Sequence, residues 1–492
     1  MKKTIFPLAL CFLGFSVWAQ QDPVVVSYAE TIQQNDLKKH LEVIASDAMQ
    51  GRGTGEVGQK MAAAYIAHHF QQLGLQGPVK GGDNKGFYQP VALYQATTEL
   101  ATIRTAKKTF SNSTQDLAFL GSVDTQGEQS MELVFGGAGK EEDLAGLDLS
   151  GKVVLIVSEA RGASRLALDK GAAHALVVNK KTDEEFAEWN KAMGHYFTSG
   201  RLSVSKPDKN ASGTFFIKPS VALEVMGINS KTLQSVFEGT NKKKIKNSTV
   251  NILVKAKVSD VPTENVLGYL EGSDKKEELL VITAHYDHVG MEGEEIYNGA
   301  DDDGSGTVAV LELAEAFAKA KKEGKGPRRS ILFMTVTGEE KGLLGSAYYA
   351  SNPVFPLSNT VVDLNIDMIG RIDPKHEQAK EYVYLVGSDR LSSELHTLSE
   401  KANATYTKLE LDYTYNDEAH PERIYYRSDH WNFAKNNIPI IFYYNGSHAD
   451  YHKPTDTVEK IDYEMLQKRA QLVFYTAWEI ANRENRLVVD KK

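Results

Sequence analysis

Residues 279–306, LLVITAHYDHVGMEGEEIYNGADDDGSG, contain the pattern that decides the fold. Leu279–Ala284 is a continuous apolar run, which is typical of a strand buried on both faces of a parallel sheet. This strand leads directly into His285 and Asp287, and three further acidic residues follow at 301–303. A buried strand that ends in metal-binding residue types predicts a site at the end of the strand.

The rest of the C-terminal half repeats the alternation of strands and helices. We predict strands at Ile331–Val336, Val361–Ile366 and Ile438–Tyr444, because each is a short apolar run. Between and after them we predict helices, including Thr307–Ala320 and a long amphipathic one at Tyr463–Glu484. Buried strands that alternate with helices predict an α/β fold with a mostly parallel central sheet flanked by helices.

Polar residues follow the carboxyl ends of these strands. Glu339 and Glu340 follow one strand, Asp367 follows the next, and the last leads to a loop that carries His452. Taken singly, residues of these types occur commonly in helix caps, turns and solvated surfaces. Their shared position at one sheet edge favours a site, because ligands bind at the carboxyl ends of strands in open α/β sheets.

The residue types at this edge fit zinc. Two histidines and three carboxylates are good zinc ligands, and two zinc ions would carry four positive charges. Three carboxylates and one bridging hydroxide would balance that charge, whereas a single zinc would not need so many ligands. The only cysteine is Cys11, near the N-terminus, so a metal site in the mature chain must use histidine and carboxylates.

The first residues have the features of a secretory signal peptide. Lys2 and Lys3 precede an apolar segment at Ile5–Val17, which is too short to span a bilayer. Small residues then favour cleavage after Ala19, so we assign residues 1–19 to a signal peptide. The sequence therefore predicts an exported protein, periplasmic or secreted, without a stable membrane anchor after cleavage.

Length and charge limit the remaining possibilities. A chain of 492 residues exceeds one ordinary core, and its net charge of −9 argues against nucleic acid as a partner. We assign residues 20–105 to the first part of a catalytic domain, 106–255 to a small β-rich insertion, and 256–492 to the rest of the catalytic domain. Within the insertion, Val153–Val157 and Ala175–Val178 are predicted strands.

Six segments resemble, in the same order, the two-zinc exopeptidase family that includes bacterial leucyl aminopeptidase, glutamate carboxypeptidase and glutaminyl cyclase. They are AHYDHVG, NGADDDGSG, TGEEKGLLGS, LNIDMIGR, YRSDHWNFAKNNIPIIFYY and YHKPTDT. The segment ASDAMQGRGTGEVGQKMAAAYIAHHFQQLGL is similar to the opening of that family, so the likeness covers about 22–105 and 260–485. The middle segment SGKVVLIVSEARGASRLALDKGAAHALVV resembles a protease-associated domain.

The resemblance implies a ligand set for two zinc ions in each chain. His285 and Asp367 would bind one ion, Glu340 and His452 would bind the other, and Asp302 would bridge the two.

It also implies roles for the neighbouring residues. Glu339 would act as the general base, and Asp287 would orient the imidazole of His285 through its second nitrogen. The peptide bond between Asp302 and Asp303 would be cis.

The function implied by the resemblance is that of an aminopeptidase, which hydrolyses N-terminal residues from peptide substrates. A carboxypeptidase or dipeptidase on the same fold would need a cationic pocket, for which Arg371, Arg423 and Arg427 are candidates. Relatives that are glutaminyl cyclases lack part of the ligand set, and non-catalytic relatives such as the transferrin receptor ectodomain lose ligands. This chain retains all five, which favours the hydrolase.

Overall fold

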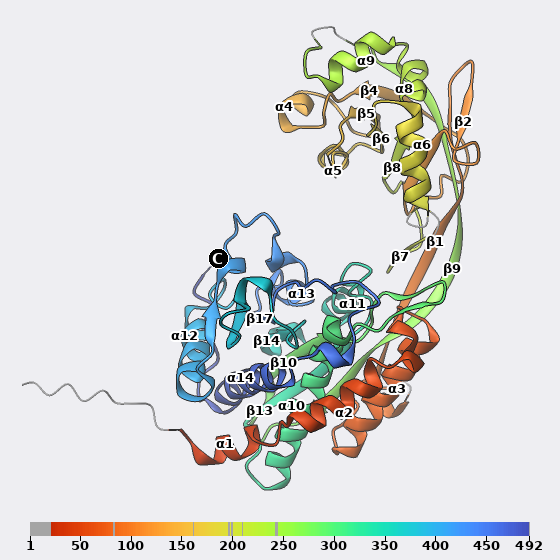
Figure 1. The fold of residues 1–492 in the computed structure, drawn as a ribbon. Helices are drawn as coiled ribbons and strands as arrows, with labels where there is room; N and C mark the ends of the chain where they lie inside the picture. Colours follow the sequence, from red (N-terminus) through yellow and green to blue (C-terminus); the bar gives the residue numbers. More distant parts are fainter. Residues whose placement is uncertain are drawn as a thin grey trace, which may run out of the picture. The chain divides into compact units, whose positions relative to one another are not determined.

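The computed structural model describes residues 21–81, 84–160, 162–194, 197, 200–208, 210–241 and 245–491. The chain forms two compact units (Figure 1). Unit 1 combines the segment that ends at Pro90 with Glu264–Lys492, and unit 2 is Val91–Thr263. The sequence analysis placed these boundaries at 105 and 255. The predicted signal peptide, residues 1–19, lies outside the described residues.

Unit 1 contains the predicted succession of strands and helices. Its helices are α1 (Pro23–Ala29), α2 (Gln34–Ile44), α3 (Val57–Gln72), α10 (Gly306–Lys322), α11 (Leu344–Ser351), α12 (Ser393–Ala402), α13 (Trp431–Ala434) and α14 (Tyr463–Asn482). Its strands include β10 (Lys275–His285), β11 (Gly290–Glu292), β12 (Glu295–Tyr297), β13 (Arg329–Val336), β14 (Thr360–Ile366), β15 (Tyr382–Val386), β16 (Glu410–Asp412) and β17 (Ile440–Tyr444). Among the described residues, no helix combines the length and apolarity needed to cross a membrane.

The central sheet of unit 1 is mostly parallel, which confirms the predicted fold class. Its strand order is β16-β15-β17-β14-β10-β13-β9, where β9 is Ser248–Leu270. β10 pairs in parallel with β13 and β14, and β14 pairs in parallel with β17. β9 and β15 join antiparallel neighbours. The four mutually parallel strands therefore end at one edge of the sheet.

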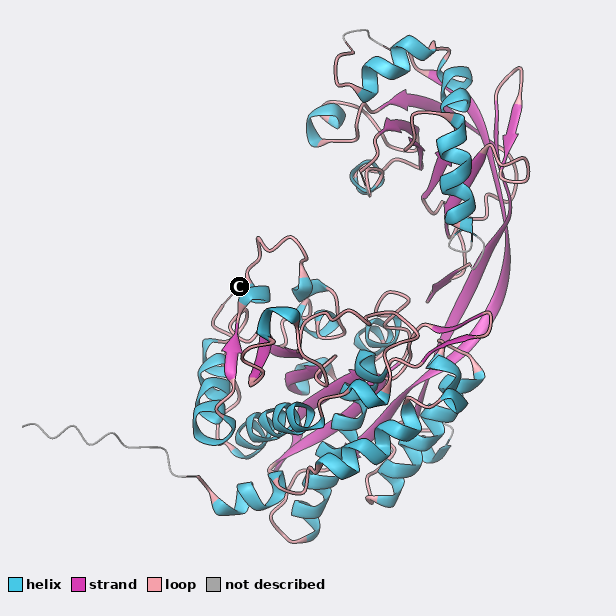
Figure 2. Ribbon diagram, viewed as in Figure 1, coloured by secondary structure: helices cyan, strands magenta, loops and turns pink. Residues whose placement is uncertain are grey.

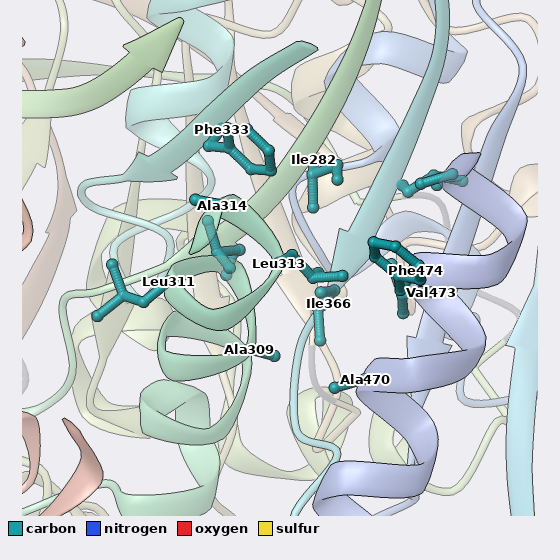
Figure 3. Close-up of a cluster of buried hydrophobic side chains, with 14 of the residues drawn as sticks. Ile282, Ala309, Leu311, Leu313, Ala314, Phe333, Ile366, Ala470, Val473 and Phe474 are labelled. Atoms are coloured by element: carbon teal, nitrogen blue, oxygen red, sulfur yellow. The ribbon is translucent and has the colours of Figure 1, made fainter. Parts of the chain in front are cut away.

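Alternate residues of the strands enter two different cores. Ile282, Phe333 and Ile366 face the helices of one layer, where they pack with Leu313 of α10 and Phe474 of α14 (Figure 3). The intervening strand residues join a second cluster on the opposite face, which includes side chains from α11 and α13. Helices thus lie on both faces of the strands. Figure 2 shows the helices in cyan and the strands in magenta. Burial on both faces explains the continuous apolar runs in the sequence.

Unit 2 contains the strands that continue the paired strand path beyond β9. The chain enters and leaves it within two long strands, β1 (Tyr88–Arg104) and β9. The other strands are β2 (Thr109–Ser111), β3 (Leu117–Gly121), β4 (Gln129–Phe135), β5 (Val153–Val157), β6 (His174–Val178), β7 (Arg201–Ser203) and β8 (Gly213–Ile217). The helices among its described residues are α4 (Glu141–Leu144), α5 (Arg165–Asp169), α6 (Asp183–Ala192), α8 (Pro219–Met226) and α9 (Ser230–Phe237). The strands β4, β5, β6 and β8 pair in parallel, and the unit has its own apolar core.

Candidate metal centre

The carboxyl ends of four strands of unit 1 supply the predicted site residues. β10 ends at His285 itself, and β13 and β14 are followed within a few residues by Glu340 and Asp367. His452 lies in the loop after β17, and Asp302 lies in a short π-helical segment, η3 (Ala300–Ser305), immediately before α10. The structure brings these five residues together, because the parallel strands end at the same edge of the sheet.

One group of potential ligands surrounds His285. Its Nε2 atom lies 3.3 Å from Asp302 Oδ1 and 3.6 Å from Asp367 Oδ1. One ligand atom from each of the three residues lies within 4.8 Å of the others. All three side chains are buried, so a cation here would be held by protein atoms on several sides.

A second group lies on the other side of the same aspartate. His452 Nε2 lies 3.1 Å from Asp302 Oδ2 and 3.1 Å from Glu340 Oε2. Asp302 thus directs one carboxylate oxygen toward His285 and the other toward His452. This is the arrangement that a carboxylate shared by two metal ions requires.

His288, Asp302 and Glu340 also offer one ligand atom each within 4.8 Å of one another, and the sequence analysis did not assign His288 a role. It is fully buried, its Nδ1 lies 2.8 Å from Glu340 Oε1, and the same atom lies 3.8 Å from Asp302 Oδ2. Gly299 makes room for it, because a Cβ at that position would come within 2.5 Å of the imidazole ring. The segment AHYDHVG contains this histidine, but its sequence position alone does not reveal the contact with Glu340.

Glu339 is adjacent to Glu340 but occupies a different position. Its Oε2 lies 3.9 Å from His285 Nε2, and it is absent from both groups of potential ligands among the described residues. Burial raises the pKa of Glu339 well above its usual range, and Glu340 and Asp367 raise it further against the opposing effect of His285. The two glutamates therefore have distinct surroundings.

Asp287 differs in one respect from the role that the resemblance implied. The backbone carbonyl of Asp287, rather than its carboxylate, lies within hydrogen-bond distance of His285 Nδ1, at 3.0 Å. The nearer carboxylate oxygen is 3.9 Å from that nitrogen. The carboxylate instead accepts hydrogen bonds from Thr54 Oγ1, at 2.7 Å, and from the backbone N–H of Glu339, at 3.1 Å. Asp287 therefore also fixes the backbone at Glu339.

The acidic residues beside Asp302 hold the loops in place. The peptide bond between Asp302 and Asp303 is cis, as the resemblance implied. The Asp303 carboxylate accepts hydrogen bonds from the backbone N–H groups of His285, at 3.2 Å, and Met368, at 3.0 Å. Asp456 accepts from the backbone N–H of Asp302, at 3.2 Å. These bonds connect the loops that carry the potential ligands.

The chemistry of the converging atoms fits a divalent cation. His285 Nε2, Asp302 Oδ2 and Glu340 Oε1 are buried and make no hydrogen bond, although nitrogen and oxygen atoms lie close together. Buried polar atoms are normally hydrogen-bonded, so a cluster of such atoms without partners indicates a site for a ligand. Histidine nitrogen and carboxylate oxygen are the donors that zinc binds in tetrahedral or five-coordinate sites.

The charged groups at this edge also stabilise one another. Burial acts to raise the pKa of Asp302, but His285 and His452 outweigh it and hold that pKa well below its usual range. Burial acts to lower the pKa of His452, but Asp302 and Glu340 raise it to about 10. Asp302 is therefore ionised at neutral pH, which is the state that binds a metal ion.

The three arginines considered for carboxylate recognition have different surroundings. Arg371 Nη2 forms an ion pair of 2.8 Å with Asp450, and Nη1 lies 3.6 Å from Asp456. The guanidinium of Arg423 lies over the ring of Tyr426 at 4.7 Å. The side chain of Arg427 is exposed.

Sequence comparison relates unit 1 to known enzymes. Residues 265–477 match Peptidase family M28. A probable leucine aminopeptidase from Arthroderma otae is 32% identical over 214 residues, which cover 42% of this chain and 55% of that protein. The chain thus spans about half the length of that relative. Aminopeptidase YwaD from Bacillus subtilis is 26% identical over 460 residues, which cover 91% of this chain and 85% of that protein.

Solved structures share the fold over nearly the whole chain. An aminopeptidase from Aneurinibacillus sp. strain AM-1 superposes with a TM-score of 0.57 at 21% identity, over 95% of this chain and 98% of that one. BSAP, a zinc aminopeptidase from Bacillus subtilis, superposes with a TM-score of 0.50 at 20% identity, over 94% and 98% of the two chains.

Proposed function

We propose, from the premise that residues 265–477 belong to peptidase family M28, that this protein is a zinc-dependent aminopeptidase. The observation that carries the proposal is the position of Asp302, whose two carboxylate oxygens face two separate groups of metal-binding residues. Two sequence relatives, a probable leucine aminopeptidase and aminopeptidase YwaD, support the same reaction class. The substrates would be peptides.

Two zinc ions would bind in each chain. His285 and Asp367 would hold one, His452 and Glu340 the other, and Asp302 would contribute one oxygen to each. We assign His452 as the ligand because its Nε2 lies 3.1 Å from both Asp302 Oδ2 and Glu340 Oε2, whereas His288 Nδ1 lies 3.8 Å from Asp302 Oδ2. With metal bound, His288 would orient the Glu340 carboxylate, whose Oε1 lies 2.8 Å from its Nδ1.

Bound zinc would activate water and polarise the scissile carbonyl. Glu339 would accept a proton from the attacking water and return it to the departing amine, which is general acid–base catalysis. The backbone N–H of Glu339 donates to the Asp287 carboxylate at 3.1 Å, so the base is held beside the metal ligands without being one of them. Asp287 would contribute through this contact and through its carbonyl contact with His285.

Cleavage from the amino end is favoured over cleavage from the carboxyl end. Arg371 is engaged by Asp450 and Asp456, and Arg423 stacks on Tyr426, so these two would have to break contacts to bind a substrate carboxylate. Arg427 is exposed and is the arginine left for a carboxypeptidase.

The experiment is a panel of aminoacyl chromogenic substrates and short peptides, each with a free or an acetylated α-amine. We expect hydrolysis of the free forms, loss of activity on acetylated forms, and loss of activity after zinc chelation. Equal rates on free and acetylated peptides would overturn the aminopeptidase assignment, and release of residues from the carboxyl end would support a carboxypeptidase.

We also propose that the chain is exported. The support is the sequence of residues 1–19, with its two lysines, apolar segment and small residues before the cleavage position. N-terminal sequencing of the mature protein from the periplasm or medium should give Gln20 as the first residue. An N-terminus at Met1 would contradict cleavage.

A further inference from the structure

The glycine-rich segment Gly51–Gly55 lies against the loop that follows β10. Gly51 has φ of 66°, and a Cβ there would come within 2.2 Å of the carbonyl oxygen of Gly290. Gly53 forms an isolated β-bridge with His288, and the backbone N–H of His288 donates to the carbonyl of Arg52 at 3.1 Å. The backbone of this segment therefore lies in direct contact with the histidine that faces Glu340.

The Arg52 side chain connects two loops of the metal centre. Its guanidinium is fully buried and donates from Nε to the carbonyl of Tyr286 at 2.8 Å. It also donates from Nη1 to the carbonyl of Asn298 at 2.7 Å and from Nη2 to that of Gly299 at 2.9 Å. Tyr286 lies between His285 and Asp287, and Asn298 and Gly299 precede the aspartate run. One planar group thus fixes the distance between the loop of His285 and that of Asp302.

Thr54 adds a third contact to the same loop. Its Oγ1 donates to Asp287 Oδ2 at 2.7 Å, and the hydroxyl-bearing side chain is buried. The other oxygen of that carboxylate accepts from the backbone N–H of Glu339. A chain of two hydrogen bonds therefore leads from Thr54 to the backbone of the proposed general base.

The charge of Arg52 is directed to the same region. Burial lowers the pKa of its guanidinium, while Asp287, Asp302, Asp303 and Asp456 act in the opposite direction. All four of its hydrogen bonds within the described residues go to backbone carbonyls rather than to a carboxylate. The guanidinium thus supplies a fixed positive charge to an acidic site without blocking a carboxylate oxygen.

We propose that Arg52, Gly53 and Thr54 form a positioning clamp, which sets the spacing of the loops that hold His285 and Asp302. This inference rests on the proposed zinc centre. It assigns to that centre a group of residues that do not themselves bind metal. Among the described residues, neither group of potential metal ligands includes a clamp residue. The clamp residues act through the backbone at Tyr286, Asn298 and Gly299 and through the Asp287 carboxylate.

The chain offers a matched control for a buried arginine. Arg329 is also fully buried and donates to the backbone carbonyls of Ile480, at 2.8 Å, and Arg483, at 2.7 Å. It lies at the first residue of β13, whereas Glu339 and Glu340 follow the other end of that strand. Arg329 therefore shares the burial of Arg52 and its bonds to backbone carbonyls at the opposite edge of the sheet, although its Nε also pairs with the Glu278 carboxylate at 2.6 Å.

The test compares the full-length chain with Arg52→Lys, Thr54→Val and Arg329→Lys. Zinc affinity is measured by competition with a chromophoric chelator, and stability by thermal unfolding. Steady-state kinetics at saturating zinc give kcat and KM. Lysine keeps the charge of arginine but loses its planar fork. We expect Arg52→Lys to raise the zinc dissociation constant about 10–100-fold and Thr54→Val at least about threefold, as for other residues that orient metal ligands. At saturating zinc, kcat should fall in both variants with little change in KM.

Arg329→Lys should lower the melting temperature, as Arg52→Lys does, but leave zinc affinity and kcat within about twofold of the unaltered chain. If Arg52→Lys and Thr54→Val both retain unaltered zinc affinity and kcat, the clamp is overturned and Arg52 is structural only. Should Arg52→Lys fail to fold, Thr54→Val alone decides by the same criteria. An unaltered chain that binds no zinc would instead overturn the proposed function.

Discussion

Both units contain buried parallel strands, yet the described residues form a metal-binding edge in only one of them. In unit 2, β5 and β6 are fully buried and pair in parallel, as β10 and β13 do in unit 1. β5 is followed by Ser158 and Glu159, and β6 by Asn179 and Lys180. Both groups of potential metal ligands found among the described residues belong to unit 1.

The difference shows which part of the sequence sets the chemistry. Apolar runs determine that strands pair and are buried, and they do so in both units. The residues just after the strands determine what the sheet edge can bind. In unit 1 such residues converge on Asp302, which directs its two oxygens to two groups. The following predictions test whether the function belongs to that edge alone.

The largest effect is expected from Asp302→Ala. Loss of the shared carboxylate should empty both zinc positions and reduce peptide hydrolysis to the background of the assay, because each ion loses a ligand. Metal analysis and activity assays check this. The matched control is Glu159→Ala, which removes an exposed carboxylate that follows a parallel strand of unit 2. It should leave both measurements unchanged. Two tightly bound zinc ions in Asp302→Ala would show that the bridging assignment is wrong.

The second-largest effect should distinguish the roles of the two adjacent glutamates, Glu339 and Glu340. Glu339→Gln keeps the size of the side chain but cannot accept a proton from water, so kcat should fall about 10²–10⁴-fold. Zinc content and KM should change little, since the loss falls on the transition state. Glu340→Gln should instead weaken one zinc position, and added zinc should partly restore activity.

Metal analysis and steady-state kinetics on the two glutamate variants decide between these roles. Loss of zinc from Glu339→Gln, together with full zinc occupancy in Glu340→Gln, would exchange the two assignments.

A smaller difference should distinguish the two histidines near Glu340. His452→Asn should release the zinc ion that it shares with Glu340, because the Nε2 ligand is lost. His288→Asn should weaken zinc binding about 10–100-fold but retain both positions at high zinc, as expected for a residue that orients a ligand. Zinc titration of each variant measures this. The reverse pattern would make His288 the ligand.

The smallest effect on the metal centre should come from removing unit 2. A variant in which a short linker replaces Val91–Thr263 should still bind zinc, because none of the five predicted ligands lies in that span. Circular dichroism and thermal unfolding would first establish that it folds. A folded variant without zinc would mean that unit 2 contributes to the site.

Much of the fold could be predicted because burial on two faces produces continuous apolar runs. The predicted strands Ile331–Val336 and Val361–Ile366 differ from β13 and β14 by only a few residues. β9 was harder to predict, since part of its length is exposed and its pattern is irregular. The predicted insertion, residues 106–255, begins 15 residues after the start of unit 2 and ends 8 residues before its end, and β1 and β9 continue across both boundaries of that unit.

The residues of the candidate site could likewise be predicted only in part from the sequence. Ligand types at strand ends could be found in the sequence, because parallel strands bring their ends together. His288 was not assigned, since its significance depends on a contact with Glu340, far along the chain. Arg52 was not assigned a role either, since its side chain contacts carbonyls more than two hundred residues away.

The zinc content of the purified, unaltered full-length protein tests the central claim most directly. Mass spectrometry under non-denaturing conditions, with elemental analysis as a second method, would give the number of ions per chain. The geometry around Asp302 predicts about two zinc ions per chain, because its two oxygens face two ligand groups. A chain that binds one zinc ion or none at saturating zinc would contradict the account.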